Sequence, residues 1–455
     1  MGAIIALIGL VMILMLIGLQ FTGFDGGAYL GIVTFMILPV VFAFGLLLIP
    51  VGLRRHRKLK AAAAAQQQEA PSCLPVIDLN NAQTRGVLVV SIVVAMFSAV
   101  LIASATVVGV KEMETVAFCG TVCHTVMEPQ HTAFQRSPHS KITCADCHIG
   151  AGADWFVKSK LSGAWQLVSV ALDLYPKPVP SPVHNLRPAR ETCEQCHWPT
   201  KHVGDKLQVK TKFADDETNT ESKTVLVMKV GGQQGSTSTG IHWHVDRGVN
   251  IRYLSDASRQ NIYDIEMTTP DGEKRVYKTA TAPTGPSEWR TMDCVDCHNR
   301  PSHTFYSADL ELNNALEDGR IDKTLPFIKR EGLRVLQEGE YASHDEARAA
   351  IAREVEAFYK ANHADVATEK ADAIRAAGAA LGDIYSWNVF PKMKVTWGTY
   401  TNNLGHGEDA PGCFRCHDKK HSTADGQRIG ANCKTCHAVL ADEEEDPEIL
   451  RALRP

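Results

Sequence analysis

Twelve of the 13 cysteines in this chain fall into six close pairs, and each pair is followed at once by a histidine. Five pairs read C-x-x-C-H, whereas the first reads C-G-T-V-C-H and is one residue longer. The paired cysteines are Cys119, Cys123, Cys144, Cys147, Cys193, Cys196, Cys294, Cys297, Cys413, Cys416, Cys433 and Cys436. The histidines that follow them are His124, His148, His197, His298, His417 and His437.

The C-x-x-C-H pattern predicts covalent attachment of c-type haem. The two thiols form thioethers with the porphyrin vinyl groups, and the adjacent histidine then coordinates the iron. A zinc site, a dithiol redox site and a disulfide are the competing interpretations. A zinc ribbon has no need of a histidine after every pair, and five repeats with a near variant leave little room for chance. We therefore predict six covalently bound haem c groups.

A low-spin, electron-transferring haem needs a second strong ligand on its iron, usually histidine or methionine. Candidates that follow or precede the attachment motifs are Met127, His139, His184, His242, His244, His303, His406 and His421. Of His242 and His244, only one is expected to bind an iron. Met127 is the candidate for the first haem, and ordinary packing would account for it equally well. His344 and His363 are instead predicted at the start and the end of a helix.

Three apolar stretches precede the first motif, at residues 3–21, 28–53 and 86–110. About 20 apolar residues cross the core of a bilayer, so each stretch predicts a transmembrane helix. Pro39 is expected to kink the second of them. The basic residues within 54–60 place the loop 54–85 in the cytoplasm. All haem motifs then lie on the opposite, oxidising side of a bacterial inner membrane, in the periplasm.

The fold class predicted is a membrane-anchored multihaem cytochrome c, with three transmembrane α-helices and a mostly helical or irregular, haem-packed periplasmic part that carries a small β insertion. Strands are expected at 224–230, 240–245, 249–254, 262–269 and 274–279, and Ser343 with Glu346 predicts the start of a helix that runs to about residue 362. The predicted segments are the anchor 1–110, a triple-haem domain 111–202, a β-rich insertion 203–286, a fourth haem segment 287–309, a helical segment 310–390 and a two-haem segment with an acidic, solvated tail 391–455.

Residues 86–200 resemble the NapC/NirT family of membrane-anchored quinol dehydrogenases. The resemblance is carried by C-G-T-V-C-H-T-V-M-E-P from Cys119, by Ser137-Pro-His139 and by C-A-D-C-H from Cys144. The three-helix anchor and the further haem sites look more like the larger inner-membrane cytochromes of metal-reducing bacteria. The resemblance implies that a haem close to the membrane accepts electrons from menaquinol or ubiquinol, that His139 is a distal ligand, and that a lysine and an acidic residue lie beside the quinol.

Oxidation of a quinol releases two protons as well as two electrons, so a quinol site also needs a proton acceptor. The candidate quinol-site residues are Lys158, Lys160, Gln166, Glu128 and Asp154, with Glu112 and Glu114 as further proton acceptors. The sequence thus predicts a chain that oxidises membrane quinol at the membrane-proximal haem and passes electrons along a haem chain to a periplasmic acceptor. Whether it is better called a quinol dehydrogenase or an electron-transfer protein is left open.

Two other functions compete with this prediction. A terminal reductase would need a haem with an open face, often marked by C-x-x-C-K, and the sequence has no such motif. A wiring subunit of a larger respiratory complex, or reverse flow to quinone, would use the same residues. The partners expected are the membrane quinone pool and a periplasmic cytochrome or reductase, and either a homo- or a hetero-oligomer is compatible with the sequence. A net charge of −4 gives no indication of nucleic-acid binding.

Overall fold

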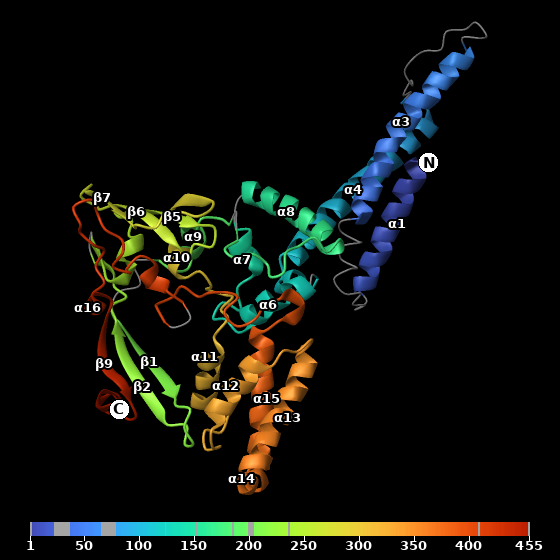
Figure 1. Cartoon of the computed structure of the whole chain (residues 1–455). Coiled ribbons are helices and arrows are strands. Elements are labelled where there is room, and N and C mark those ends of the chain that lie inside the picture. The colour runs from blue at the N-terminus through green and yellow to red at the C-terminus, as the bar shows by residue number, and fades with distance from the viewer. Residues whose placement is uncertain are drawn as a thin grey trace. The chain divides into compact units, whose positions relative to one another are not determined.

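The computed structural model describes residues 2–21, 37–64, 79–122, 124–150, 153–183, 186–198, 204–234, 237–407 and 410–453. The chain divides into two compact units, Met1–Cys123 and His124–Pro455, which Figure 1 shows in blue and in the colours from cyan to red. All helices and strands discussed below belong wholly to one unit or the other.

The first unit is helical, with α1 (Gly2–Phe21), α3 (Leu38–Ala64), α4 (Ala82–Met113) and the short α5 (Val116–Thr121). Helices α1 and α3 pack closely because glycines lie at their contact: a Cβ atom at Gly45 would come within 2.5 Å of the backbone nitrogen of Ala6. Ile13 and Phe42 are buried in the same contact. Pro39 is the second residue of α3 and Pro50 lies inside this helix, whereas residues 22–36 lie outside the described part of the chain, so the kink expected at Pro39 stays a prediction.

Within the described residues of both units, no helix has the length and apolar character required to cross a membrane.

The second unit begins with α6 (His124–Gln135), α7 (Cys144–His148), α8 (Ala153–Ala171) and α9 (Ala189–Cys193). The strands that follow form three antiparallel sheets. The first has the order β1 (Lys206–Phe213), β2 (Glu221–Met228), β9 (His437–Glu444), the second pairs β3 (Gly232–Gln234) with β4 (Thr237–Thr239), and the third has the order β7 (Lys274–Lys278), β6 (Ile262–Thr268), β5 (Asn250–Asp256), β8 (Ser287–Thr291).

The structure corrects one expectation about these segments and adds a strand that was not predicted. Residues 240–245, expected as a strand, contain the 3₁₀ helix η3 (Ile241–Val245). The first acidic residues of the tail are exposed, as expected, but they belong to β9, which pairs with β2 over Met228↔His437 to Lys223↔Glu444 and joins the end of the chain to the β-rich insertion. Figure 1 shows β9 in red beside the green β1 and β2.

A helical bundle without any attachment motif follows β8 and α10 (Cys294–Cys297). Its members are α11 (Ala308–Glu317), α12 (Ile328–Glu338), α13 (His344–Asn362), α14 (Ala364–Glu369) and α15 (Ala371–Asn388). Leu312, Leu336, Ile351 and Leu381, one from each of the four long helices, are fully buried in a common core. Ser343 caps α13 as predicted, with its side chain accepting from the backbone of Glu346.

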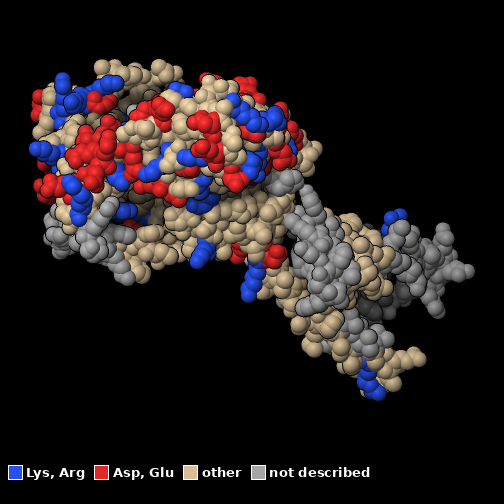
Figure 2. All heavy atoms as spheres, turned by 90° about the horizontal axis from the view of Figure 1, so that it is seen from below, with Lys and Arg blue, Asp and Glu red and all other residues tan. Residues whose placement is uncertain are grey.

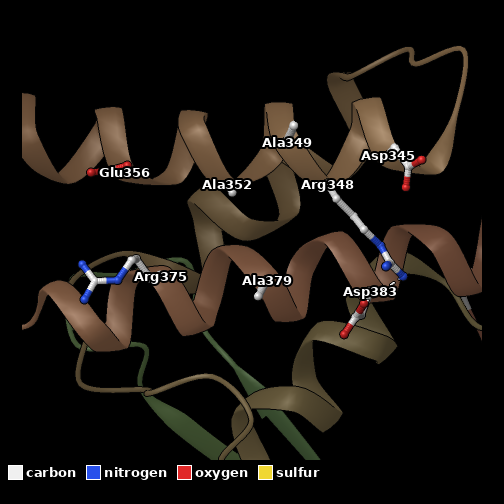
Figure 3. Close-up of a pocket in the computed structure, with 8 residues that line it drawn as sticks. All are labelled: Asp345, Arg348, Ala349, Ala352, Glu356, Arg375, Ala379 and Asp383. Carbon is white, nitrogen blue, oxygen red and sulfur yellow. Dashed lines mark ion pairs between the residues drawn. The ribbon is translucent and has the colours of Figure 1, made fainter.

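The last part of the second unit contains η4 (Pro391–Met393), η5 (Gly412–Arg415), α16 (Cys433–Cys436), β9 and α17 (Glu448–Ala452). Figure 2 shows cationic and anionic side chains interspersed over the face of the second unit seen there, and few charged side chains on the described part of the first. A groove between α13 and α15 has an alanine floor and an ion pair of 2.9 Å between Arg348 and Asp383 at one end (Figure 3). The residues that line this groove include none of the predicted site residues.

Candidate functional site

Three attachment motifs begin a single turn of α-helix, and a short polar residue caps each turn. The side chains of Thr143, Asp293 and Asn432 accept hydrogen bonds from the first backbone N–H groups of α7, α10 and α16. Residues three and four apart lie on one face of a helical turn. The local C-x-x-C-H sequence therefore turns both thiols and the histidine toward the same side, as attachment of one porphyrin requires.

The first motif is the least described. Cys119 lies in α5, and its Sγ is 3.8 Å from the carbonyl oxygen of Met113. His124 begins α6 and Met127 lies half-buried in the same helix. Cys123, the predicted distal ligand His184 and the unpaired Cys73 lie outside the described residues.

The other five motif histidines each face a second histidine from elsewhere in the chain. The ring centroids are 6.2 Å apart for His148 and His303, 5.9 Å for His197 and His139, 6.4 Å for His298 and His242, 5.8 Å for His417 and His244, and 6.1 Å for His437 and His406. Two imidazoles that bind one metal ion through bonds of about 2 Å hold their centroids roughly 6 Å apart. All five pairs therefore have the spacing of two axial ligands on a single iron.

Hydrogen bonds to backbone carbonyl groups orient several of these rings. The Nδ1 atoms of His139, His303 and His244 lie 3.2, 3.0 and 2.8 Å from the carbonyl oxygens of Pro301, Gln130 and Ile241. An imidazole that donates through Nδ1 presents the lone pair of Nε2 to a metal. The carbonyl partners thus select the tautomer in which Nε2 is the metal-binding atom.

Burial favours the neutral form, which a metal ligand needs, in several of the paired histidines. Removal from solvent lowers the pKa of His148 and His244, and it lowers the pKa of His303 to about 4. These imidazoles are therefore uncharged at neutral pH, and no proton has to leave them before a metal binds.

The turn η3 provides both His242 and His244, whereas only one of them was expected to take part. In a strand, residues two apart point to the same face, so the expected strand would have offered both rings to one site. A 3₁₀ helix has three residues per turn, so residues two apart diverge. His242 thus faces His298 while His244 faces His417, and Trp243 packs edge-on against His244 with centroids 5.8 Å apart.

His421 differs from the other candidates because both of its ring nitrogens already have partners. Its Nδ1 is 2.9 Å from Asp418 Oδ1 and its Nε2 is 3.1 Å from the carbonyl oxygen of Ile262. Its side chain is almost fully buried between these groups. The structure therefore gives His421 a role in linking the fifth motif to β6, with no nitrogen left for an iron.

Interactions between cysteines of different motifs show which motifs lie next to each other. A hydrogen bond between Cys193 and Cys294 lowers the pKa of the first thiol and raises that of the second. Burial raises the pKa of Cys147, and the nearby Cys193 adds to this shift. Each of these effects joins two motifs that are consecutive in the sequence.

The same relation continues toward the end of the chain. Burial raises the pKa of Cys297 to about 11, with an added contribution from Cys413, and burial also raises the pKa of Cys413, to which Cys436 adds. The second to sixth motifs therefore lie in a row that follows their order in the sequence.

The predicted quinol-site residues lie on α6 and α8. Lys158 Nζ is 4.6 Å from the centroid of Trp155, and Gln166 donates to Ser162 at 3.3 Å. Glu128 lies 3.7 Å from His344. Lys160 is half-buried on α8, and the side chain of Asp154 is outside the described part of that helix.

Comparison with known proteins gives two matches. Residues 81–176 match the N-terminal region of the NapC/NirT cytochrome c family. Over 452 residues the chain is 38% identical to the cytochrome c-type protein ImcH of Geobacter sulfurreducens (strain ATCC 51573 / DSM 12127 / PCA), and this match covers 98% of the chain and 86% of that protein. No solved structure matches the chain.

Proposed function

This chain belongs to the NapC/NirT cytochrome c family, whose members carry covalently bound haem c, and we propose that it is a hexahaem cytochrome that oxidises a membrane quinol and delivers the electrons to a periplasmic acceptor. Electron transfer is the function that the family supports in general terms. The number of haems, the quinol substrate and the acceptor are our proposals. The five facing histidine pairs are the observation that supports the haem sites, and the family supports the quinol.

We assign each pair to one haem. The motif histidine is the proximal ligand in each case, and the distal ligands in the order of the second to the sixth motif are His303, His139, His242, His244 and His406. For the first haem, His124 is proximal and Met127 stays the distal candidate. His184 and His421 are left without an iron in this assignment.

Haem iron held by two imidazoles accepts and donates one electron without opening a coordination position. The chain's own contribution is to orient these imidazoles and to favour the neutral form of several of them. A small oxyanion would have to displace a histidine that is fixed by its backbone hydrogen bond, as at His303 and His244. This arrangement favours electron transfer over terminal reduction of a small oxyanion.

The order of the motifs supports a path for electrons along the second unit. The row begins at Cys144/Cys147 and ends at Cys433/Cys436. We therefore propose that the periplasmic cytochrome or reductase docks near the sixth site. A wiring role within a larger respiratory complex, or reverse flow to quinone, would use the same row from the other end, and redox titration of the haems against the quinone couple separates these alternatives.

The membrane anchor is part of the proposal, and its support is the sequence. Stretches 3–21, 28–53 and 86–110 carry no charged residue. The basic residues within 54–60 favour a cytoplasmic loop, and haem attachment favours the periplasm for the motifs. We propose that this anchor keeps the first haem within reach of the membrane quinone pool, in a bacterial inner membrane.

The function is tested with purified, oxidised protein mixed with menaquinol and ubiquinol analogues while haem reduction is followed by absorbance. We expect rapid reduction by one of the two, blocked by a quinone-site inhibitor. If neither quinol reduces protein that dithionite reduces fully, the chain is not a quinol dehydrogenase, and the wiring or reverse-flow function takes its place.

Replacing Lys160 with methionine is expected to slow reduction by quinol at least tenfold and to leave reduction by dithionite unchanged. The reason is that the lysine is proposed to hydrogen-bond a quinol oxygen, and loss of a hydrogen bond to a charged group costs about 1.5–3 kcal/mol. Stopped-flow absorbance measures both rates. Lys206→Met, an exposed lysine on β1, is the matched control. Equal quinol-driven rates in the two variants would remove Lys160 from the site.

A further inference from the structure

Arg300 is a buried arginine whose charge has no anionic partner among the described residues. It lies between His298 and His303, which belong to two different histidine pairs, and it is only 8% exposed. Its Nε and Nη2 atoms are buried, and no described residue accepts a hydrogen bond from either of them. Leaving a charged donor unsatisfied costs more than leaving a neutral one, so a group that completes this site is expected.

The aromatic surroundings of Arg300 account for only part of its environment. The guanidinium carbon is 4.0 Å from the centroid of Tyr400 and 5.9 Å from that of Phe305. Rings stacked on the face of a guanidinium satisfy its positive charge in part, but its N–H groups point outward in the plane. The two rings therefore fix the plane of the group and leave its donors directed at something else.

Comparison with Arg415 shows that this is unusual in the same protein. Arg415 is equally buried, at 9% exposed, and its Nε and Nη1 atoms donate to the carbonyl oxygens of Gly412 and Arg259 at 3.0 and 2.7 Å, while Nη2 donates to that of Asp296. No carboxylate of the described residues forms an ion pair with Arg300.

We propose that Arg300 is a carboxylate-binding residue and that its ligand is a haem propionate from one of the two sites that flank it. The inference rests on the haem sites proposed above. A guanidinium binds a carboxylate through two parallel hydrogen bonds, which would satisfy the donors that the protein leaves open. A haem propionate is a carboxylate that enters the interior of the protein together with the haem, so no acidic side chain has to be buried for the purpose.

This assignment gives Arg300 a positioning and tuning role. A cation fixed beside a haem disfavours the more positive ferric state, so Arg300 raises the midpoint potential of the haem whose propionate it binds. Because the aromatic rings hold the guanidinium in one plane, the propionate and hence the porphyrin are fixed in orientation as well.

The test compares full-length, haem-loaded Arg300→Gln and Arg300→Lys proteins with the unmodified protein. In the Gln variant we expect one haem to have a lower midpoint potential. At a fixed potential, its ratio of reduced to oxidised forms should fall about tenfold, which corresponds to about 59 mV for a one-electron couple. The Lys variant keeps the charge but not the paired hydrogen bonds, so we expect the ratio of reduced to oxidised haem to fall only about threefold. In both variants the resonance Raman band of propionate bending is expected to move.

The control is Arg252→Gln. Like Arg300, Arg252 lies over an aromatic ring, here that of Trp289, but it is exposed and its guanidinium is 3.5 Å from the carboxylate of Glu266. It should change neither the potentials nor the propionate band. A potential shift with an unmoved propionate band in both Arg300 variants would overturn the inference, as would unchanged potentials. If the Gln variant fails to assemble, the Lys variant decides by the same two measurements. Absence of haem from the unmodified protein would instead contradict the proposed function.

Discussion

Replacement of His244 by alanine is expected to convert one haem of the protein from a low-spin to a high-spin state and to leave the others unchanged. The haem attached at Cys413 and Cys416 keeps His417, but it loses the imidazole whose ring centroid lies 5.8 Å away. An iron with one open position binds carbon monoxide or cyanide, which the other haems exclude. Electron paramagnetic resonance and titration with carbon monoxide should both count one such haem per chain.

The matched control is His421→Ala, which removes another buried histidine near the same motif. Both nitrogens of His421 are engaged by Asp418 and the carbonyl oxygen of Ile262. We expect a loss of stability of about 1–3 kcal/mol from the unsatisfied partners and no high-spin haem. The opposite pattern, with a high-spin haem in His421→Ala and none in His244→Ala, would show that the two histidines have been assigned the wrong roles.

A companion variant, His242→Ala, separates the two sites that share η3. It should leave one coordination position free on the iron of the haem attached at Cys294 and Cys297, because His242 faces His298. The haem that His417 binds should keep both of its ligands. If either variant made both haems high-spin, the substitution would have unfolded η3 as a whole, and the result would not identify which histidine binds which iron.

The attachment motifs could be predicted from the sequence because their chemistry is local. Two thiols and a histidine within five residues need only one helical turn, which Thr143 and Asp293 cap from the preceding position. Every histidine that faces a motif histidine was also among the candidates named from the sequence. Which histidine faces which motif was not predictable, since His303 follows the fourth motif in the sequence and yet faces His148 of the second. That pairing depends on how distant segments pack.

The errors in the predicted strands have a similar origin. The segment I-H-W-H-V has a strand-like composition, yet it forms η3 because its two histidines are held by separate partners. Strand β9 contains acidic residues, which are unfavourable in strands, so the sequence did not predict it, although these residues are exposed as expected. Pairing with β2, in which Val225 is fully buried, supplies the stabilisation that the local sequence lacks.

Replacement of Asp296 by alanine is expected to lower the stability of the second unit by about 3–5 kcal/mol, the range for removing one partner of a buried ion pair. Asp296 lies between the two cysteines of the fourth motif and is only 2% exposed. Its Oδ1 accepts from Tyr253 at 2.5 Å and from Arg290 at 3.0 Å, and its Oδ2 accepts from the backbone of Asp293 at 2.6 Å. One carboxylate therefore joins β5 and β8 to the helical turn that carries the thiols.

The urea midpoint, followed by Soret circular dichroism, measures this effect, and haem content per chain measures its consequence for assembly. Asp264→Ala is the control, because Asp264 lies in the sheet that contains Tyr253 and Arg290. Its partner is the exposed Lys278 at 3.5 Å, and exposed ion pairs contribute about 0–1 kcal/mol to stability. Asp296→Asn keeps the shape and should fall between the two. If Asp296→Ala were as stable as the control, the sheet and the fourth motif would be held together by other contacts, such as the hydrogen bond from Arg415 to the backbone of Asp296.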